Sequence, residues 1–202
     1  MDVRDFIKMN GAGNDFVVLD LRLAESAGPA PRKAVRPSAE VAARIADRHL
    51  GVGCDQVILI EPSDTGLADA QLVFLNADGS EAGACGNGTR CVADLLMGEA
   101  ETDAISLETL HGVLDCDRSA DGAVTVDMGR AKLDWRDIPL AEPRDTLHLA
   151  IGEGVLSDPA GTSMGNPHAT FFVEDVAAIP IEQLGPKLER HKLFPERANI
   201  GV

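Results

Sequence analysis

One stretch of the chain, residues 76–91, constrains the fold more than any other part of the sequence. It reads NADGSEAGACGNGTRC and places Cys85 directly before alternating glycines and small polar residues. The run QLVFLN at 71–76, apolar over 72–75, predicts a buried strand that ends in a turn at Asp78 and Gly79. Apolar residues with helical spacing follow the stretch. We therefore expect Cys85 between a strand and a helix, at the N-terminus of that helix.

This position has a chemical consequence for the thiol of Cys85. A helix N-terminus favours negative charge, so we expect a lowered pKa and a reactive thiolate. Glycine at positions 86 and 88 would let backbone N–H groups approach a bound anion closely. The alternative is a buried and inert cysteine in a glycine-rich turn, which the flanking sequence makes the weaker interpretation.

Residues 76–91 resemble the first active-site motif of the diaminopimelate epimerases, which invert an α-carbon of diaminopimelate without pyridoxal phosphate. Four shorter segments resemble the same family in the same order along the chain. They are KMNGAGNDF at 8–16, GVGCDQ at 51–56, MGNPH at 164–168 and ERANI at 196–200. The resemblance extends over essentially the whole chain.

The resemblance implies an α+β fold with two pseudo-symmetric halves, each a β-roll or barrel around a central helix. Residues 1–128 would form the first half, and residues 129–202 the start of a second half that is incomplete here. Short sequential strands also disfavour a doubly wound parallel sheet.

The resemblance also implies a set of site residues. Cys85 matches one of two catalytic thiols, and Gly86 and Asn87 match positions that hold the substrate α-carboxylate. The implied substrate-binding amides are Asn14, Gln56, Asn76, Asn166 and Asn199. His168 matches a residue near the thiols that modulates their pKa, although a loop histidine with a satisfied hydrogen bond is an equal alternative.

Inversion of an α-carbon requires one group to remove a proton and a second group to return one to the opposite face. In the family a second Cys-Gly-x-Gly motif supplies that second thiol, and this chain lacks it. We interpret Cys54, Cys91 and Cys116 as core residues. We therefore expect an amino-terminal portion of the enzyme that does not epimerise alone.

Other functions remain open at this stage. A related cofactor-independent isomerase, such as a proline racemase-like protein, is the closest alternative enzyme. A non-catalytic truncated homologue is a second. A hydrolase built on Cys85 and His168 is less favoured, because nothing marks a third residue that would orient the histidine.

The net charge of −15, from 33 acidic and 18 basic side chains, argues against nucleic acid or an anionic membrane as partner. We expect a cytoplasmic protein with free thiols, since no leader or membrane segment is evident. No metal site and no cofactor are expected. The expected partner is a small-molecule substrate, diaminopimelate. The sequence is also compatible with a homodimer.

The local patterns predict the remaining elements. Helices are expected from Ser38 to about Leu50, with Gly51 ending the helix, and over 181–191. Residues 28–37 are expected to form a loop. Strands are expected over 16–20, 56–61, 71–76, 105–109, 112–116, 123–127 and 170–174, with a further hairpin from 139–143 and 147–151.

Overall fold

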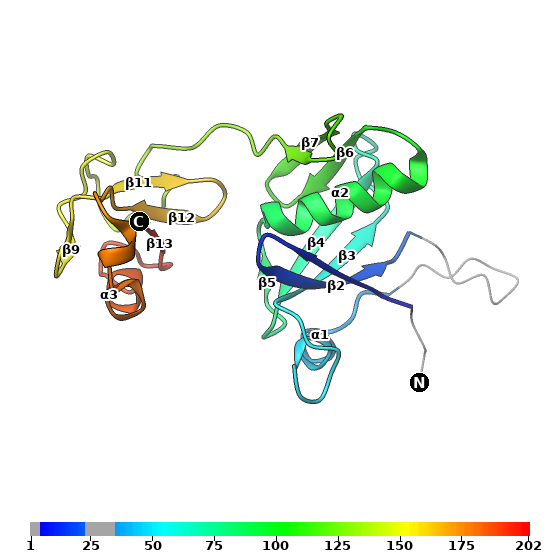
Figure 1. Ribbon diagram of the computed structural model, residues 1–202, viewed down its shortest axis with the longest axis horizontal. Coiled ribbons are helices and arrows are strands. Elements are labelled where there is room, and N and C mark those ends of the chain that lie inside the picture. The colour runs from blue at the N-terminus through cyan, green and yellow to red at the C-terminus, as the bar shows by residue number, and fades with distance from the viewer. Residues whose placement is uncertain (1–4, 23–34) are drawn as a thin grey trace, which may run out of the picture. The chain divides into compact units, whose positions relative to one another are not determined.

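The computed structural model describes residues 5–22 and 35–202 (Figure 1). The chain divides into two compact units, Met1–Met128 and Gly129–Val202, called here the first and the second unit. Both mix short strands with few helices, so the fold class is α+β.

The first unit is built on one mixed sheet. Its strands are β1 (Ile7–Gly11), β2 (Asn14–Asp20), β3 (Gln56–Glu61), β4 (Ala70–Asn76), β5 (Glu81–Ala82), β6 (Ala104–Thr109), β7 (Gly112–Arg118) and β8 (Val124–Val126). The strand order is β1-β2-β3-β4-β6-β7-β8, with β5 paired to β4. Most neighbours are antiparallel, whereas β2 with β3 and β4 with β6 are parallel. The strand predictions in this unit are confirmed within two residues at each end.

Helix α2 (Gly86–Ala100) packs along one face of this sheet (Figure 1). The helix contacts strands at both ends of the sheet order, β1 and β8, so the sheet curves around it. Alternate residues of β2, β3 and β4 are buried toward α2, as the period of two along a strand requires. The intervening residues form a second core under α1 (Ala39–Ala46) on the other face.

Helix α1 begins as predicted, because the Ser38 hydroxyl oxygen accepts the Val41 N–H at 3.3 Å. The predicted end was wrong, since the helix stops at Ala46. Asp47 leaves the helical conformation, and its carboxylate accepts the N–H groups of His49 and Leu50 at 2.7 and 2.8 Å. These local bonds compete with another helical turn.

Gly51 still lies against the C-terminus of α1. A Cβ there would lie 1.9 Å from the carbonyl oxygen of Arg44, so only glycine fits. Glycine is therefore required here because the returning chain packs closely against α1. It does not serve as the residue that ends the helix.

The second unit has a smaller set of elements. They are β9 (Gly152–Glu153), β10 (Leu156–Ser157), β11 (Ala160–Ser163), β12 (Pro167–Thr170), a 3₁₀ turn (Val176–Ala178), α3 (Ile181–Glu189) and β13 (Asn199–Gly201). β9 and β10 form a hairpin, and β11, β12 and β13 form a three-stranded sheet. Leu184 and Leu188 of α3 are buried in one core with Leu149 and Phe171. The predicted helix over 181–191 is confirmed, ending two residues early.

Two strand predictions in this unit were wrong. Residues 139–143 and 147–151 form turns over the core instead of a hairpin, because Pro139 and Pro143 each lack the N–H that a strand ladder needs. The strand expected over 170–174 ends at Thr170, which pairs with the first residue of β11, Ala160. Beyond that point the neighbouring strand has ended.

The predicted loop over 28–37 lies partly outside the described residues; positions 35–37 have no regular structure. None of the helices in the described ranges has the length and apolar character needed to cross a bilayer.

Candidate functional site

Cys85 caps the N-terminus of α2, where the sequence predicted it. Its backbone is extended, and its sulfur accepts the Gly88 N–H at 3.4 Å. Its carbonyl oxygen accepts the Thr89 N–H at 2.8 Å and the Thr89 hydroxyl at 2.9 Å. These bonds hold a half-buried thiol at the first turn of the helix.

The pKa of Cys85 differs from the expectation. Burial raises the pKa of this thiol above its ordinary 9.0, and the N–H groups of Gly88 and Asn87 lower it by less. The helix N-terminus therefore only partly offsets the cost of placing a thiolate inside the fold. The surroundings of Cys85 therefore favour the thiol over the thiolate.

The other three thiols are buried in apolar cores, as the sequence predicted. Their exposed fractions are 2% for Cys54, 8% for Cys91 and 1% for Cys116. Burial raises the pKa of each thiol, to about 11 for Cys116. All four cysteines are free, and Cys85 is the most accessible of them.

The two glycines beside Cys85 differ in their surroundings. A Cβ at Gly86 would make an ordinary van der Waals contact with the Met128 sulfur at 3.6 Å, so packing does not require glycine there. A Cβ at Gly88 would lie 2.8 Å from Ile58 Cδ1. Gly88 is therefore glycine because the core packs against it, and its N–H already bonds the Cys85 sulfur. The contact with the core is a structural reason for glycine at position 88, whereas an anion-binding role for Gly86 stays a prediction.

Three of the predicted amides lie near the same end of the sheet, and Asn14 is two residues beyond Phe16, which is the partner of Gln56. Gln56 is opposite Asn76 in the register of β3 and β4, and Asn14 is the first residue of β2. Each is two residues along its strand from a residue buried against α2. Those buried residues are Phe16, Ile58 and Phe74. Because side chains alternate along a strand, the amides continue the α2-facing side of the sheet.

Asn14 is hydrogen-bonded to the start of α2, whereas Gln56 and Asn76 are bonded to each other. The Asn87 side-chain N–H donates to Asn14 Oδ1 at 2.9 Å, and Arg90 donates to Asn87 Oδ1. Gln56 donates to Asn76 Oδ1 at 3.0 Å. The first of these bonds joins Asn14 of β2 to Asn87, which is 73 residues away in the sequence and lies on the first turn of the helix that Cys85 caps.

The remaining predicted residues lie in the second unit. His168 of β12 is opposite Asn199 of β13, and its Nε2 lies 2.9 Å from Asn166 Oδ1. The Asn199 amide donates to the Pro167 carbonyl at 3.2 Å. Burial lowers the pKa of His168, so its ring is neutral at pH 7.

A pocket of about 410 Å³ in this unit is lined by Asn166 and Asn199 together with Glu189, Glu196 and Arg197. Glu196 and Arg197 lie in the turn before β13 rather than in a strand. Arg197 donates to Glu189 at 3.2 Å.

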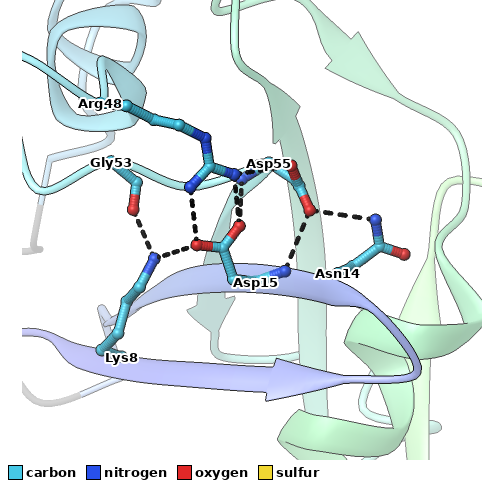
Figure 2. Close-up of polar contacts among 6 residues, drawn as sticks. All are labelled: Lys8, Asn14, Asp15, Arg48, Gly53 and Asp55. Atoms are coloured by element: carbon cyan, nitrogen blue, oxygen red, sulfur yellow. Dashed lines mark hydrogen bonds and ion pairs between the residues drawn. The ribbon is translucent and has the colours of Figure 1, made fainter.

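A charged cluster beside Asn14 was not predicted (Figure 2). It consists of Lys8, Asp15, Arg48 and Asp55. Arg48 donates to Asp15 at 2.7 Å and to Asp55 at 2.8 Å, and Lys8 donates to Asp15 at 2.7 Å. These bonds hold the pKa of Asp15 well below its ordinary 3.8. Asp15 and Asp55 directly follow and precede predicted site residues, but nothing in the sequence marks Arg48 as their partner.

Within the described ranges, no three His, Cys, Asp or Glu side chains gather in an arrangement that would hold a metal ion.

Comparison with known proteins identifies the family. Residues 6–133 match the family model described as diaminopimelate epimerase. Proteins named diaminopimelate epimerase from Acidiphilium cryptum and Rhodospirillum centenum are 57% and 52% identical to the chain. These matches cover 98% and 99% of the chain, and 68% and 66% of the relatives. The chain thus spans about two thirds of the length of these relatives.

Solved structures show the same fold. A hydroxyproline epimerase from Agrobacterium vitis, with bound trans-4-hydroxy-L-proline, matches with a TM-score of 0.53 at 17% identity. That match covers 92% of this chain and 54% of the other. A Bacillus anthracis phenazine biosynthesis protein of the PhzF family matches with a TM-score of 0.52 at 17% identity, over 88% of this chain and 58% of the other. With identities of 43–57% to eight such relatives, the chain belongs to the diaminopimelate epimerase family, which is a family of isomerases.

Proposed function

We propose that the protein interconverts the LL and meso forms of diaminopimelate without a cofactor, and that Cys85 is one of its two acid–base groups. The observation that carries the proposal is the half-buried Cys85 thiol at the N-terminus of α2, beside the linked amides of Asn14 and Asn87. The names of the relatives support the choice of substrate.

The chemistry follows from the surroundings of Cys85. A general acid–base group must hold a proton in one direction of the reaction and accept one in the other. The raised pKa of Cys85 keeps it protonated at rest, ready to donate a proton to the carbanion. In the reverse direction its thiolate removes the α-proton, and the electron pair of the C–H bond moves onto the substrate carboxylate.

The carbanion must be stabilised while it exists. In the proposed arrangement, the backbone at Gly86 and the amide of Asn87 hold the α-carboxylate, where the negative charge develops. Packing within the protein does not require glycine at position 86, and glycine there leaves the backbone without a side chain that would keep a ligand away. The amides of Gln56 and Asn76 contribute further donors and acceptors for a zwitterionic ligand.

We further propose that the second acid–base group is none of the other cysteines within residues 1–202. Cys54, Cys91 and Cys116 are buried in apolar cores, where a substrate cannot reach them. Residues 1–202 on their own are then expected to leave LL-diaminopimelate uninverted. Asn166, Asn199 and His168 are the proposed contributions of the second unit to substrate binding and to tuning the thiols.

The test compares two cysteines of the same region in the catalytically competent protein that contains residues 1–202. Cys85→Ala is expected to abolish formation of meso-diaminopimelate from the LL form in a coupled assay. Cys91→Ala is the matched control, and it is expected to reduce stability while retaining turnover. Near-normal turnover by Cys85→Ala would refute the proposed mechanism. Turnover of proline but not of diaminopimelate would refute the proposed substrate.

Residues 1–202 alone are assayed in heavy water by chiral analysis and mass spectrometry. We expect no meso product. Meso product at a rate comparable to that of the competent protein would show that a group within residues 1–202, with His168 as the first candidate, supplies the second proton.

A further inference from the structure

We propose that Asp55 and Arg48 are positioning residues. They fix the orientation of the side-chain amide groups of Asn14 and Asn87 beside Cys85. The inference rests on the proposed function, because it concerns how the same site is prepared for its substrate. It draws on a continuous set of hydrogen bonds from the charged cluster to the first turn of α2, which we call the amide relay. The relay consists of Arg48, Asp55, Asn14, Asn87 and Arg90.

The first step is at Asp55 (Figure 2). Its Oδ2 accepts the Asn14 side-chain N–H and the Asp15 backbone N–H, both at 3.1 Å, and its Oδ1 accepts from Arg48 at 2.8 Å. An ionised carboxylate only accepts hydrogen bonds. Asp55 therefore requires the NH₂ group of Asn14, and not its oxygen, to face it.

The second step is at α2. With its NH₂ group toward Asp55, Asn14 presents Oδ1 to Asn87, which donates at 2.9 Å. The Oδ1 of Asn87 is then free to accept from Arg90, whose guanidinium only donates. The two amides thus lie between the Asp55 carboxylate, which only accepts, and the Arg90 guanidinium, which only donates. Rotating either amide by 180° would place a donor against a donor or an acceptor against an acceptor. Both amides therefore have one favoured orientation.

The third step concerns how Asp55 is held. Asp15 and Asp55 exchange bonds, since the Asp15 N–H donates to Asp55 Oδ2 and the Asp55 N–H donates to Asp15 Oδ1 at 3.0 Å. Arg48 bridges both carboxylates, and Lys8 pairs with Asp15 and donates to the Gly53 carbonyl. Two cations balance two anions in this cluster, so Asp55 keeps a fixed position in the short loop before β3.

The consequence for the site is a defined polarity. The relay uses one side-chain N–H of Asn14 and one of Asn87. Each amide has a second N–H to offer an acceptor, such as the carboxylate of an amino-acid substrate. Without Asp55, either amide could present an oxygen instead, which would repel that carboxylate.

The first test needs no activity. In the ¹⁵N-labelled 202-residue chain, Asp55→Asn is expected to shift the side-chain amide resonances of both Asn14 and Asn87, although Asp55 contacts only Asn14. The matched control is Glu61→Gln, which removes a carboxylate paired with Arg36 at the other end of β3 and is expected to move neither resonance. An unmoved Asn87 resonance in folded Asp55→Asn, or an equal shift in Glu61→Gln, would overturn the proposal.

A second variant covers the case in which Asp55→Asn does not fold. Arg48→Lys keeps the charge, but a single ammonium cannot bridge both carboxylates as the guanidinium does. The arginine side chain is 55% exposed, so the fold tolerates the change. The same two resonances are expected to shift, and unchanged resonances in this variant would likewise overturn the proposal.

The second test uses the catalytically competent protein. Asp55→Asn is expected to raise KM for diaminopimelate about tenfold, the effect of losing one well-oriented hydrogen bond to a charged group, with a smaller change in kcat. Asp55→Glu is expected to recover part of the affinity. A purely structural role would lower the amount of active protein and leave KM in place.

The two tests separate the two proposals. Coupled resonances in a protein that does not act on diaminopimelate would refute the proposed function and keep the relay. Epimerisation with unchanged KM and uncoupled resonances would refute the relay alone.

Discussion

Replacing Gly88 or Gly98 of α2 by alanine is expected to have different effects on stability. A Cβ at Gly88 would lie 2.8 Å from Ile58 Cδ1 and 3.1 Å from Phe74 Cε1, inside the core. A Cβ at Gly98 would meet nothing within 4 Å, and the residue is exposed. Replacing each by alanine therefore changes helix propensity at both positions but changes core packing only at Gly88.

The magnitudes follow from these contacts. Alanine is favoured over glycine inside a helix by about 1 kcal/mol, so Gly98→Ala is expected to stabilise the first unit by roughly that amount. Gly88→Ala gains the same term but adds a methyl group to a filled core, which costs about 1–3 kcal/mol. The gain is common to both variants, so the difference between them isolates the packing cost of about 1–3 kcal/mol.

Alkylation of Cys116 against urea concentration measures this difference. This thiol is 1% exposed in the core under α2, so it reacts only when the first unit opens. With a urea slope of roughly 2 kcal/mol per molar, Gly98→Ala is expected to raise the midpoint by about 0.5 M. Gly88→Ala is expected to leave it unchanged or lower it. Equal upward shifts in both variants would refute the argument that Gly88 is fixed by core packing.

Three further outcomes are expected. A limiting amount of alkylating agent should label Cys85 ahead of the three buried thiols, and peptide mapping that finds another cysteine labelled first in the folded chain would contradict the site. Ser38→Ala should cost about 1 kcal/mol by removing the cap of α1, measured by denaturant unfolding; Ser38→Asp, which keeps an acceptor, should cost less. The pKa of Asp15 is lower in the folded chain than its ordinary 3.8, so its stabilisation is complete above that value and is lost as pH falls below it. Asp15→Asn should flatten the loss of stability on acidification, and an unchanged acid-unfolding profile would count against the ion pairs with this carboxylate.

The elements of the first unit could be predicted because local patterns and tertiary packing agree there. Residues 57–60 are all apolar, and this part of β3 is buried on both faces, between α2 and α1. The position of Cys85 followed from the change between strand and helix periods on its two sides. The strand prediction over 139–143 was wrong because the apolar side chains there cover the core from turns. In a turn, alternating apolar residues do not indicate a strand.

The bonds that join the candidate site could not be predicted in the same way. The bond between Asn14 and Asn87 depends on how β2 is placed beside α2, which local sequence does not specify. Arg48 lies just after α1, in a segment that is typical of an exposed helix end. It nevertheless bridges the carboxylates of Asp15 in β2 and Asp55 in the loop before β3. The pKa of Cys85 was predicted in the wrong direction because the helix N-terminus can be inferred from sequence, whereas the depth of burial cannot.

Core and candidate site share one face of the sheet, and this links stability to the state of the thiol. Gly88 is the point of contact, since its N–H donates to the Cys85 sulfur while Ile58 and Phe74 occupy the space that a Cβ would need. A methyl group there would also lie 3.4 Å from that sulfur.

A change that pushes the first turn of α2 outward would lengthen the N–H to sulfur bond and expose the thiol. These two changes act on its pKa in opposite directions, because the N–H bond lowers it and burial raises it. Burial is the larger influence in the structure, so Gly88→Ala should lower the pKa of Cys85 on balance. The pH dependence of Cys85 alkylation in the folded variant would measure the shift, and an upward shift would show that the N–H bond outweighs burial.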